Sequence, residues 1–212
     1  IPPVAATDAP ARRIIGRGGM AVNAGMVTSW ALAVTVILLA TGWKRELLDD
    51  VSPLAAASAS AALLCAAGFP GLPAEAPQPV ALFFACAALR KADGGKRIQA
   101  LFGAVLAGAV WIWLRHLYAA DPVFILRDAQ LDGPFAAGVL AAAVTGSFRT
   151  QLAAVTAAAV AARWLEPAAI GAWGWLDGFF AALAAARAVT LLARVASALA
   201  GRLRPQAGRK AD

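Results

Sequence analysis

The stretch AGMVTSWALAVTVILLATGW, residues 24–43, decides the fold of this chain, because it runs for 20 residues without one charged side chain. An α-helix rises 1.5 Å per residue, so a segment of this length covers the roughly 30 Å of hydrocarbon in a bilayer. Trp30 and Trp43 lie near its two ends, where indole rings prefer the membrane interface, and Lys44 and Arg45 end it. The stretch therefore predicts a transmembrane helix.

Six further apolar blocks follow, separated by short polar connections. They are Pro53–Phe69, Val80–Leu89, Ile98–Tyr118, Pro134–Phe148, Gln151–Leu165 and Leu176–Leu199. The prolines of residues 69–79, the Asp93–Lys96 turn and the Gly/Trp-rich stretch 171–175 are typical of loops. The pattern predicts an all-α fold, a polytopic transmembrane helix bundle of about seven short spans. The blocks 134–148 and 151–165 form either a tight hairpin or one long tilted helix, which would reduce the count to six.

Composition supports the same fold class. Hydrophobic residues make up 61% of the 212 residues, charged residues only 15%, and the mean hydropathy is +0.69, whereas soluble domains are about half apolar and one quarter charged. The formal charge of +7 does not indicate nucleic-acid binding, because the basic residues lie between apolar blocks rather than in a stripe with exposed aromatics. They predict contact with the lipid bilayer and with anionic lipid headgroups at the cytoplasmic face.

The placement of Lys and Arg predicts the orientation. With seven spans and the N-terminus outside, the cytoplasmic side receives Lys44, Arg45, the basic run 90–97, Arg149, Arg194 and the C-terminal tail, while Arg115 and Arg127 stay in outer loops. Six spans would put the basic run 90–97 and the tail on opposite sides, against the positive-inside rule. We therefore expect a multi-pass protein of a bacterial plasma membrane, with the N-terminus outside and the C-terminus in the cytoplasm.

The chain divides into three parts. Residues 1–23 are rich in Pro, Arg and Gly and precede candidate starts at Met20 and Met26, so we interpret them as a disordered or non-native tail. Residues 24–200 form the transmembrane domain, and residues 201–212 form a basic cytoplasmic tail. Within the domain, the pairs Gly103/Ala107 and Ala104/Gly108 predict close approach between helix backbones.

Arg187 is the first candidate for function, because an ionised group inside a bilayer is costly. It lies near the middle of the last block, ten positions after Asp177, with Thr190 and Arg194 on roughly the same helical face. Arg187 either binds an anionic substrate or lipid headgroup, or it pairs with a carboxylate of another helix and holds the bundle together. We expect the second interpretation, in which Arg187 has a structural role.

Arg115 and His116 form a second candidate pair, at the outer end of the fourth block. Histidine is the side-chain type whose ordinary charge change lies closest to neutral pH, so a proton relay through His116 is one interpretation, although an interfacial histidine is more often a hydrogen-bonded residue of the aromatic belt. The outer loop carries Asp121, Asp128 and Asp132, whose spacing matches no calcium loop and favours loop solubility and helix capping.

The sequence contains no motif of a catalytic, metal or cofactor site. Cys65, Cys86 and the single histidine cannot supply four zinc ligands, and no G-x-S-x-G, H-E-x-x-H or C-x-x-C occurs. No carboxylate lies at the centre of a predicted span, so an intramembrane enzyme with paired aspartates is not predicted. We expect no enzyme activity and no cofactor.

Residues 38–47, LLATGWKREL, lie where the first span meets its inner loop, and here the sequence resembles the YphA-like family of small bacterial membrane proteins. The resemblance implies a polytopic plasma-membrane protein and no site residues. We therefore predict a structural or regulatory membrane component, with membrane proteins as partners in a larger assembly. The alternative is a transporter of small solutes or ions with a substrate site at Arg187, Asp177, Arg194, Arg115 and His116.

Overall fold

The structure, a computed structural model, describes residues 24–49, 51–165 and 171–203, and in these ranges it is helical without a strand. The helices are α1 (Met26–Ala40), α2 (Lys44–Leu48), α3 (Pro53–Gly68), α4 (Pro77–Arg90), α5 (Gly94–Ala120), the 3-10 turn η1 (Pro122–Phe124), α6 (Asp132–Val144), α7 (Phe148–Leu165) and α8 (Ala172–Leu203). The all-α class is confirmed. The predicted tail 1–23, with Met20, and residues 204–212 of the basic tail lie outside the described residues.

Each predicted apolar block overlaps one of the longer helices, and the blocks 134–148 and 151–165 correspond to two separate helices, α6 and α7. Thr145 ends α6 with an extended backbone, φ −126° and ψ 127°, and its hydroxyl donates to the Ala141 carbonyl at 2.6 Å. The prediction of one long tilted helix is therefore wrong, and the hairpin interpretation is confirmed.

Three predicted loops are shorter than expected. Pro77 and Pro79 lie in the first turn of α4, where a helix needs no N–H donor. Helix α5 begins at Gly94 rather than after the Asp93–Lys96 turn, and α8 begins at Ala172. In α8 the indole N–H of Trp175 donates to the carbonyl oxygen of Ala159 at 3.1 Å, which anchors a segment expected to be a loop.

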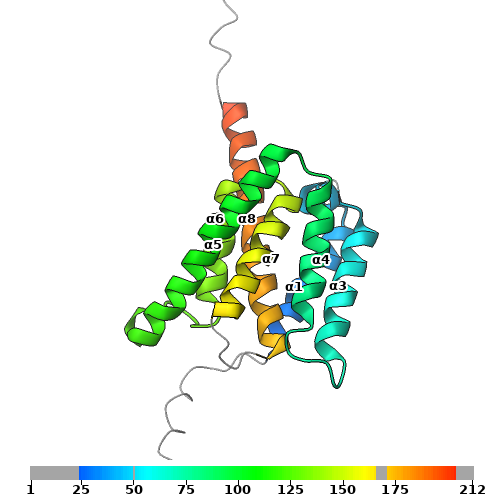
Figure 1. Cartoon of the computed structure of the whole chain (residues 1–212). Helices are drawn as coiled ribbons and strands as arrows, with labels where there is room; N and C mark the ends of the chain where they lie inside the picture. Colours follow the sequence, from blue (N-terminus) through cyan, green and yellow to red (C-terminus); the bar gives the residue numbers. More distant parts are fainter. Residues whose placement is uncertain (1–23, 50, 166–170, 204–212) are drawn as a thin grey trace, which may run out of the picture.

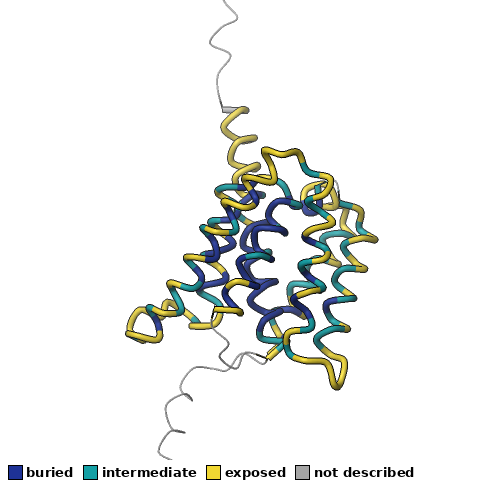
Figure 2. The backbone as a smooth tube through the Cα atoms, viewed as in Figure 1, coloured by how far each residue is buried: buried dark blue, intermediate teal, exposed yellow. Residues whose placement is uncertain are grey.

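Helix α7 lies at the centre, surrounded by α4, α5, α6 and α8 (Figures 1 and 2). Alanine is the most frequent residue at its buried positions, and small residues let neighbouring backbones approach. A methyl group added at Gly103 would lie 3.4 Å from Cβ of Ala154, and one at Gly108 would lie 3.5 Å from Cα of Ala158. The predicted close approach through Gly103 and Gly108 is thereby confirmed.

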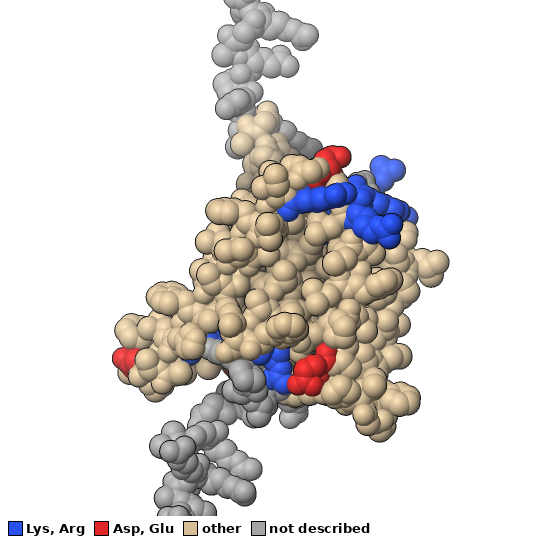
Figure 3. Space-filling model, in the orientation of Figure 1, with Lys and Arg blue, Asp and Glu red and all other residues tan. Residues whose placement is uncertain are grey.

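The longer helices run up and down the molecule in turn, so their connections collect at two ends (Figure 1). We call one the Asp49 end, which holds residues 44–49, 51–52, 90–97 and 145–149, and the other the Asp177 end, which holds Gly25, Glu75, Arg163 and Asp177. Figure 3 shows Lys, Arg, Asp and Glu side chains towards the two ends of the visible face, with an uncharged band between them.

Two of the described helices, α5 and α8, are long and apolar enough to cross a membrane. Helices α1, α3 and α6 are apolar but have only 15, 16 and 13 residues. At 1.5 Å per residue they measure about 20–24 Å, less than the roughly 30 Å of a typical hydrocarbon core. Helix length and hydropathy alone therefore support two membrane spans in the described residues, not seven.

Candidate functional site

A network of hydrogen-bonded polar groups, three of them buried, lies at the Asp49 end. It contains Asp49, Gln151, Arg187, Thr190 and Arg194, which we call the Asp49 cluster. Asp49 follows the short helix α2, whereas Gln151 comes from α7 and the other three residues come from α8. The cluster therefore joins segments that are far apart in the chain.

Asp49 is held in an unusual backbone conformation, with φ 49° and ψ −116°. A residue other than glycine rarely adopts a positive φ, and such strain costs on the order of 1–3 kcal/mol. Its carboxylate accepts a hydrogen bond of 2.6 Å from the backbone N–H of Phe148, the first residue of α7. The strained turn thus places a negative charge at the N-terminus of the central helix, where it complements the helix dipole.

Arg187 reaches the same carboxylate from α8 and is only 4% exposed. Its Nη1 donates to Oδ2 of Asp49 at 3.3 Å and to Oε1 of Gln151 at 3.2 Å. Its Nη2 donates to the carbonyl oxygen of Glu46, and the guanidinium lies 5.6 Å from the ring centroid of Phe148. The buried cation is therefore paired with a carboxylate and bonded to protein acceptors.

The three residues predicted to share one face of α8, Arg187, Thr190 and Arg194, all form hydrogen bonds within the Asp49 cluster. Arg194, two turns beyond Arg187, donates from Nη2 to Oδ1 of Asp49 at 2.9 Å. The hydroxyl of Thr190 accepts from Nε2 of Gln151 at 2.6 Å and donates to the carbonyl oxygen of Ala186. These three residues of α8 thus bind the carboxylate of Asp49 and the side-chain amide of Gln151.

Asp177 does not belong to this cluster, although sequence reasoning placed it beside Arg187. It lies near the start of α8 at the Asp177 end and is 6% exposed. Its carboxylate accepts 2.7 Å hydrogen bonds from the backbone N–H groups of Gly25 and Thr28 and from the Thr28 hydroxyl. Asp177 therefore binds the N-terminus of α1 to the start of α8.

Arg115 and His116 are likewise remote from Arg187. They lie near the C-terminal end of α5, about 28 Å along that helix from Lys96 at the Asp49 end. The guanidinium carbon of Arg115 lies 5.8 Å from the ring centroid of Trp111. The five predicted site residues thus fall into three separate places.

The aspartates of the outer loop serve as acceptors for backbone groups. Asp121 accepts from the N–H of Val123, and Asp128 accepts from that of Gln130. Asp132 accepts from the N–H groups of Leu126 and Arg127 and from the Tyr118 hydroxyl. The predicted helix capping holds for Asp121, which is the N-cap of η1, but not for Asp132: α6 begins at Asp132, its N-cap Leu131 makes no side-chain cap, and the Asp132 carboxylate bonds to the preceding loop. Within the part of the chain that the structure describes, no group of three or more His, Cys, Asp or Glu is arranged to hold a metal ion.

Sequence reasoning missed Asp49 and Gln151 as members of the site. Asp49 lies between the first two predicted apolar blocks, and no sequence pattern assigned it a role. Gln151 gave the one available signal, because it begins a predicted apolar block and a buried amide side chain needs a hydrogen-bond partner.

The charge environment of Asp49 sets its protonation. Burial acts to raise the pKa of this carboxyl, but the Phe148 N–H, the hydrogen bond from Arg194 and the charges of Arg187 and Arg194 outweigh burial. Together they hold the pKa below its ordinary value of 3.8. The carboxylate is therefore ionised at neutral pH.

This lowered pKa predicts a specific acid sensitivity. A carboxyl whose pKa is lower in the folded chain contributes stability fully above its ordinary pKa and loses it as the pH falls through the folded value. We expect the stability difference between the chain and its Asp49→Asn variant to be constant from about pH 7 to about pH 5 and to shrink below about pH 4. Thermal unfolding followed by tryptophan fluorescence measures this difference, and a gap that widens in acid would contradict the assignment.

The bonds of Asp177 predict a second effect. Asp177→Ala leaves two buried N–H groups of α1 without acceptors, which we expect to lower the free energy of unfolding by about 2–3 kcal/mol. Asp128→Ala is the matched control, because its hydrogen bond lies in an exposed loop. We expect a change within about 0.5 kcal/mol there. Equal losses in the two variants would show that Asp177 has no special role.

Comparison with protein-family models, with curated proteins and with solved structures finds no match to this chain.

Proposed function

We propose that this chain is an integral protein of a bacterial plasma membrane, a bundle of seven short spans with the N-terminus outside and the C-terminus in the cytoplasm. We further propose that it acts as a structural or regulatory membrane component. The observation that carries the second proposal is the pairing of Arg187, the deepest ionised side chain of the predicted spans, with Asp49.

The surface of the bundle supports membrane insertion. Large apolar side chains are exposed along α1, α5 and α8, and they include Trp30, Ile37, Ile98, Leu101, Phe102, Val105, Leu192 and Val195. Soluble monomers rarely expose apolar patches of more than a few hundred Å². Acyl chains of lipid would cover this surface without cost, and the uncharged band of Figure 3 has the position expected for the hydrocarbon layer.

The short helices are compatible with this proposal. Helices α1, α3, α4 and α6 are too short to cross a bilayer of ordinary thickness without help. Local thinning of the bilayer, or the extension of terminal Lys and Arg side chains to the interface, compensates for a deficit of this size. Arg90, Lys91 and Arg149 lie at such helix ends.

The bonding of Arg187 favours a structural role over transport. A substrate-binding arginine would keep donors directed to a water-filled cavity, whereas Nη1 and Nη2 of Arg187 are bonded to Asp49, Gln151 and the Glu46 carbonyl. The transporter alternative would require a substrate to displace Asp49 from both Arg187 and Arg194. The ion pairs of Asp49 with Arg187 and Arg194 therefore favour a structural role over transport.

Labelling of single cysteines tests the membrane proposal. In a chain with Cys65→Ala and Cys86→Ala, we would introduce Val123→Cys, at a position 86% exposed in the predicted outer loop, or Asp93→Cys, whose native side chain is 83% exposed between α4 and α5. We expect a membrane-impermeant maleimide to label Val123→Cys in intact cells, and Asp93→Cys only after the membrane is opened. Labelling of Asp93→Cys alone in intact cells would reverse the orientation, and recovery of the chain in the soluble fraction would refute the proposal.

A further inference from the structure

Residues 24–49 contain α1 and α2, and we call them the α1–α2 segment. Helix α1 packs mainly against α8, and Thr28 is the only buried residue among its 15, all of which the structure describes. Trp30, Val36 and Ile37 are 72%, 65% and 60% exposed. The central helix α7, by contrast, buries 12 of its 18 residues. The α1–α2 segment therefore lies at the periphery of the bundle and contributes little to its core.

The first attachment of this segment lies at the Asp177 end. The three 2.7 Å hydrogen bonds of the Asp177 carboxylate all come from Gly25 and Thr28, at the start of α1. Gly25 also lies against α8, since its φ is +92° and an added methyl group would be 3.0 Å from Cε3 of Trp173. One carboxylate of α8 thus holds the first turn of α1.

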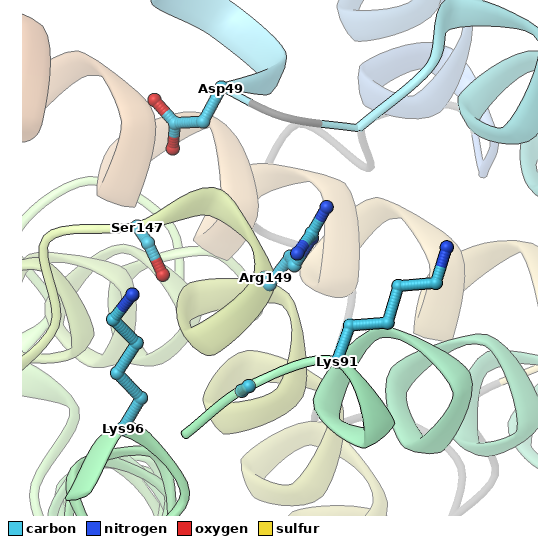
Figure 4. Close-up of a pocket in the computed structure, with 6 residues that line it drawn as sticks. Asp49, Lys91, Lys96, Ser147 and Arg149 are labelled. Atoms are coloured by element: carbon cyan, nitrogen blue, oxygen red, sulfur yellow. The ribbon is translucent and has the colours of Figure 1, made fainter.

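The second attachment lies at the Asp49 end. Arg187 and Arg194 of α8 both donate to the carboxylate of Asp49 and to the carbonyl oxygen of Glu46. Figure 4 shows the Asp49 side chain extending from the end of α2 towards the ribbon of α8. A second carboxylate, this time from the segment itself, therefore fastens its other end to the same helix.

A small cavity opens beside this second attachment. It measures about 40 Å³, and its lining includes Asp49, Lys91 and Arg149 (Figure 4). The Asp49 side chain is 19% exposed, so water reaches the carboxylate. Because water can replace hydrogen bonds that the segment gives up, separation at this end does not leave the carboxylate without partners.

Between the two attachments, α1 and α8 meet through partly buried residues of α1. In a bilayer, acyl chains are as apolar as the side chains of α8, so apolar contact alone does not hold two helices together. A released α1 would stay in the hydrocarbon layer with its backbone hydrogen bonds intact. The polar contacts at the two ends therefore do most to keep the segment in place, a step that rests on the proposed membrane insertion.

We propose that the α1–α2 segment separates from α8 as one unit while α4, α5, α6, α7 and α8 stay packed, and that Asp177 and Asp49 control this movement. Separation uncovers the face of α8 that carries Asp177 at one end and Arg187 towards the other. A partly independent unit of this kind opens at a lower free energy than the whole fold. The movement would change the surface that the bundle offers to a partner helix, as a regulatory role requires.

Distances between spin labels, measured by double electron–electron resonance on the full-length chain in lipid nanodiscs, test the proposal. The background carries Cys65→Ala and Cys86→Ala. The segment pair, Val36→Cys with Val105→Cys, joins α1 to α5. The reference pair, Phe83→Cys with Val105→Cys, joins α4 to α5. The native side chains at these three positions are 65%, 64% and 69% exposed, in the order Val36, Val105 and Phe83, so the labels do not enter the core.

Asp177→Ala is expected to raise the ratio of separated to attached segment at least about tenfold, because three hydrogen bonds at one of the two attachments are lost. The segment pair should then gain a second, longer distance, whereas the reference pair keeps its single distance. Asp128→Ala, the control for Asp177→Ala in unfolding, should leave both pairs unchanged. Thr28→Val, which removes only the hydroxyl bond, replaces Asp177→Ala if that variant does not fold, with a smaller change in the same direction.

An unchanged distance for the segment pair in the folded variant would overturn the proposal. Equal broadening of both pairs would overturn it as well, because α1 would then come apart only together with the rest of the bundle. Failure of membrane insertion is a separate result, which the cysteine labelling detects. In that case the same spin-label distances, measured in aqueous buffer, still decide whether the segment separates.

Discussion

Replacing Gly138 with alanine is expected to destabilise the chain by at least about 3 kcal/mol, the upper range for overpacking in a core that cannot yield. Gly138 lies in α6 where this helix crosses α8, and a methyl group there would be 2.1 Å from the carbonyl oxygen of Ala182 and 2.9 Å from Cβ of Ala185. The nearest atoms belong to the backbone of α8, so the helices themselves would have to separate. Unfolding in detergent, followed by tryptophan fluorescence, should show a midpoint about 6–12 °C lower.

Two other glycines provide graded controls for this variant. At Gly103 an added methyl group would meet its nearest neighbour at 3.4 Å, an ordinary contact, and at Gly146 it would meet nothing within 4 Å. We expect Gly103→Ala to change stability by less than about 1 kcal/mol and Gly146→Ala to be neutral or slightly stabilising. If all three variants unfold alike, contact between α6 and α8 at Gly138 does not hold the bundle together.

The helices followed from the apolar blocks because each block is predominantly apolar and is bounded by charged, proline or glycine residues, whereas the ends of the helices depend on contacts that a single sequence does not display. Pro77 and Pro79 read as loop residues, yet the first turn of a helix accepts proline. The stretch 172–175 read as a loop, yet Trp175 bonds to Ala159 and extends α8. The helix thus begins earlier than the local sequence predicts, in α4 because its first turn accepts proline and in α8 because of a tertiary hydrogen bond.

The candidate site was only partly predictable for a similar reason. The spacing of Arg187, Thr190 and Arg194 on one helical face was readable, because it follows from the period of a helix. Their carboxylate partner could not be predicted, because Asp49 lies 138 residues from Arg187, between two predicted blocks. Asp177 was assigned to the same site because it precedes Arg187 by ten positions, but those positions span about 15 Å along α8 and bring it to the opposite end.

Asp49→Ala is expected to be the most damaging substitution at the Asp49 cluster. It leaves Arg187 buried without its counter-charge and removes the acceptor of the Phe148 N–H and the partner of Arg194. Breaking a buried ion pair from one side costs about 3–5 kcal/mol. The loss should appear as a lower midpoint of thermal unfolding and a smaller amount of folded chain on size-exclusion chromatography in detergent.

A double variant separates the cost of an unpaired charge from the value of the pair. Asp49→Leu with Arg187→Met replaces both groups with apolar side chains, and such exchanges are often neutral because no uncompensated charge remains. We expect the double variant to be more stable than either Asp49→Leu or Arg187→Met alone, with a coupling energy of about 1–3 kcal/mol. Additive losses would show that the two residues act independently. If the pair only holds α8 to the strained turn after α2, the folded double variant should also restore growth to cells that lack the gene for this protein. A transporter that used Arg187 to bind its substrate would remain inactive in the same test, in spite of its stable fold.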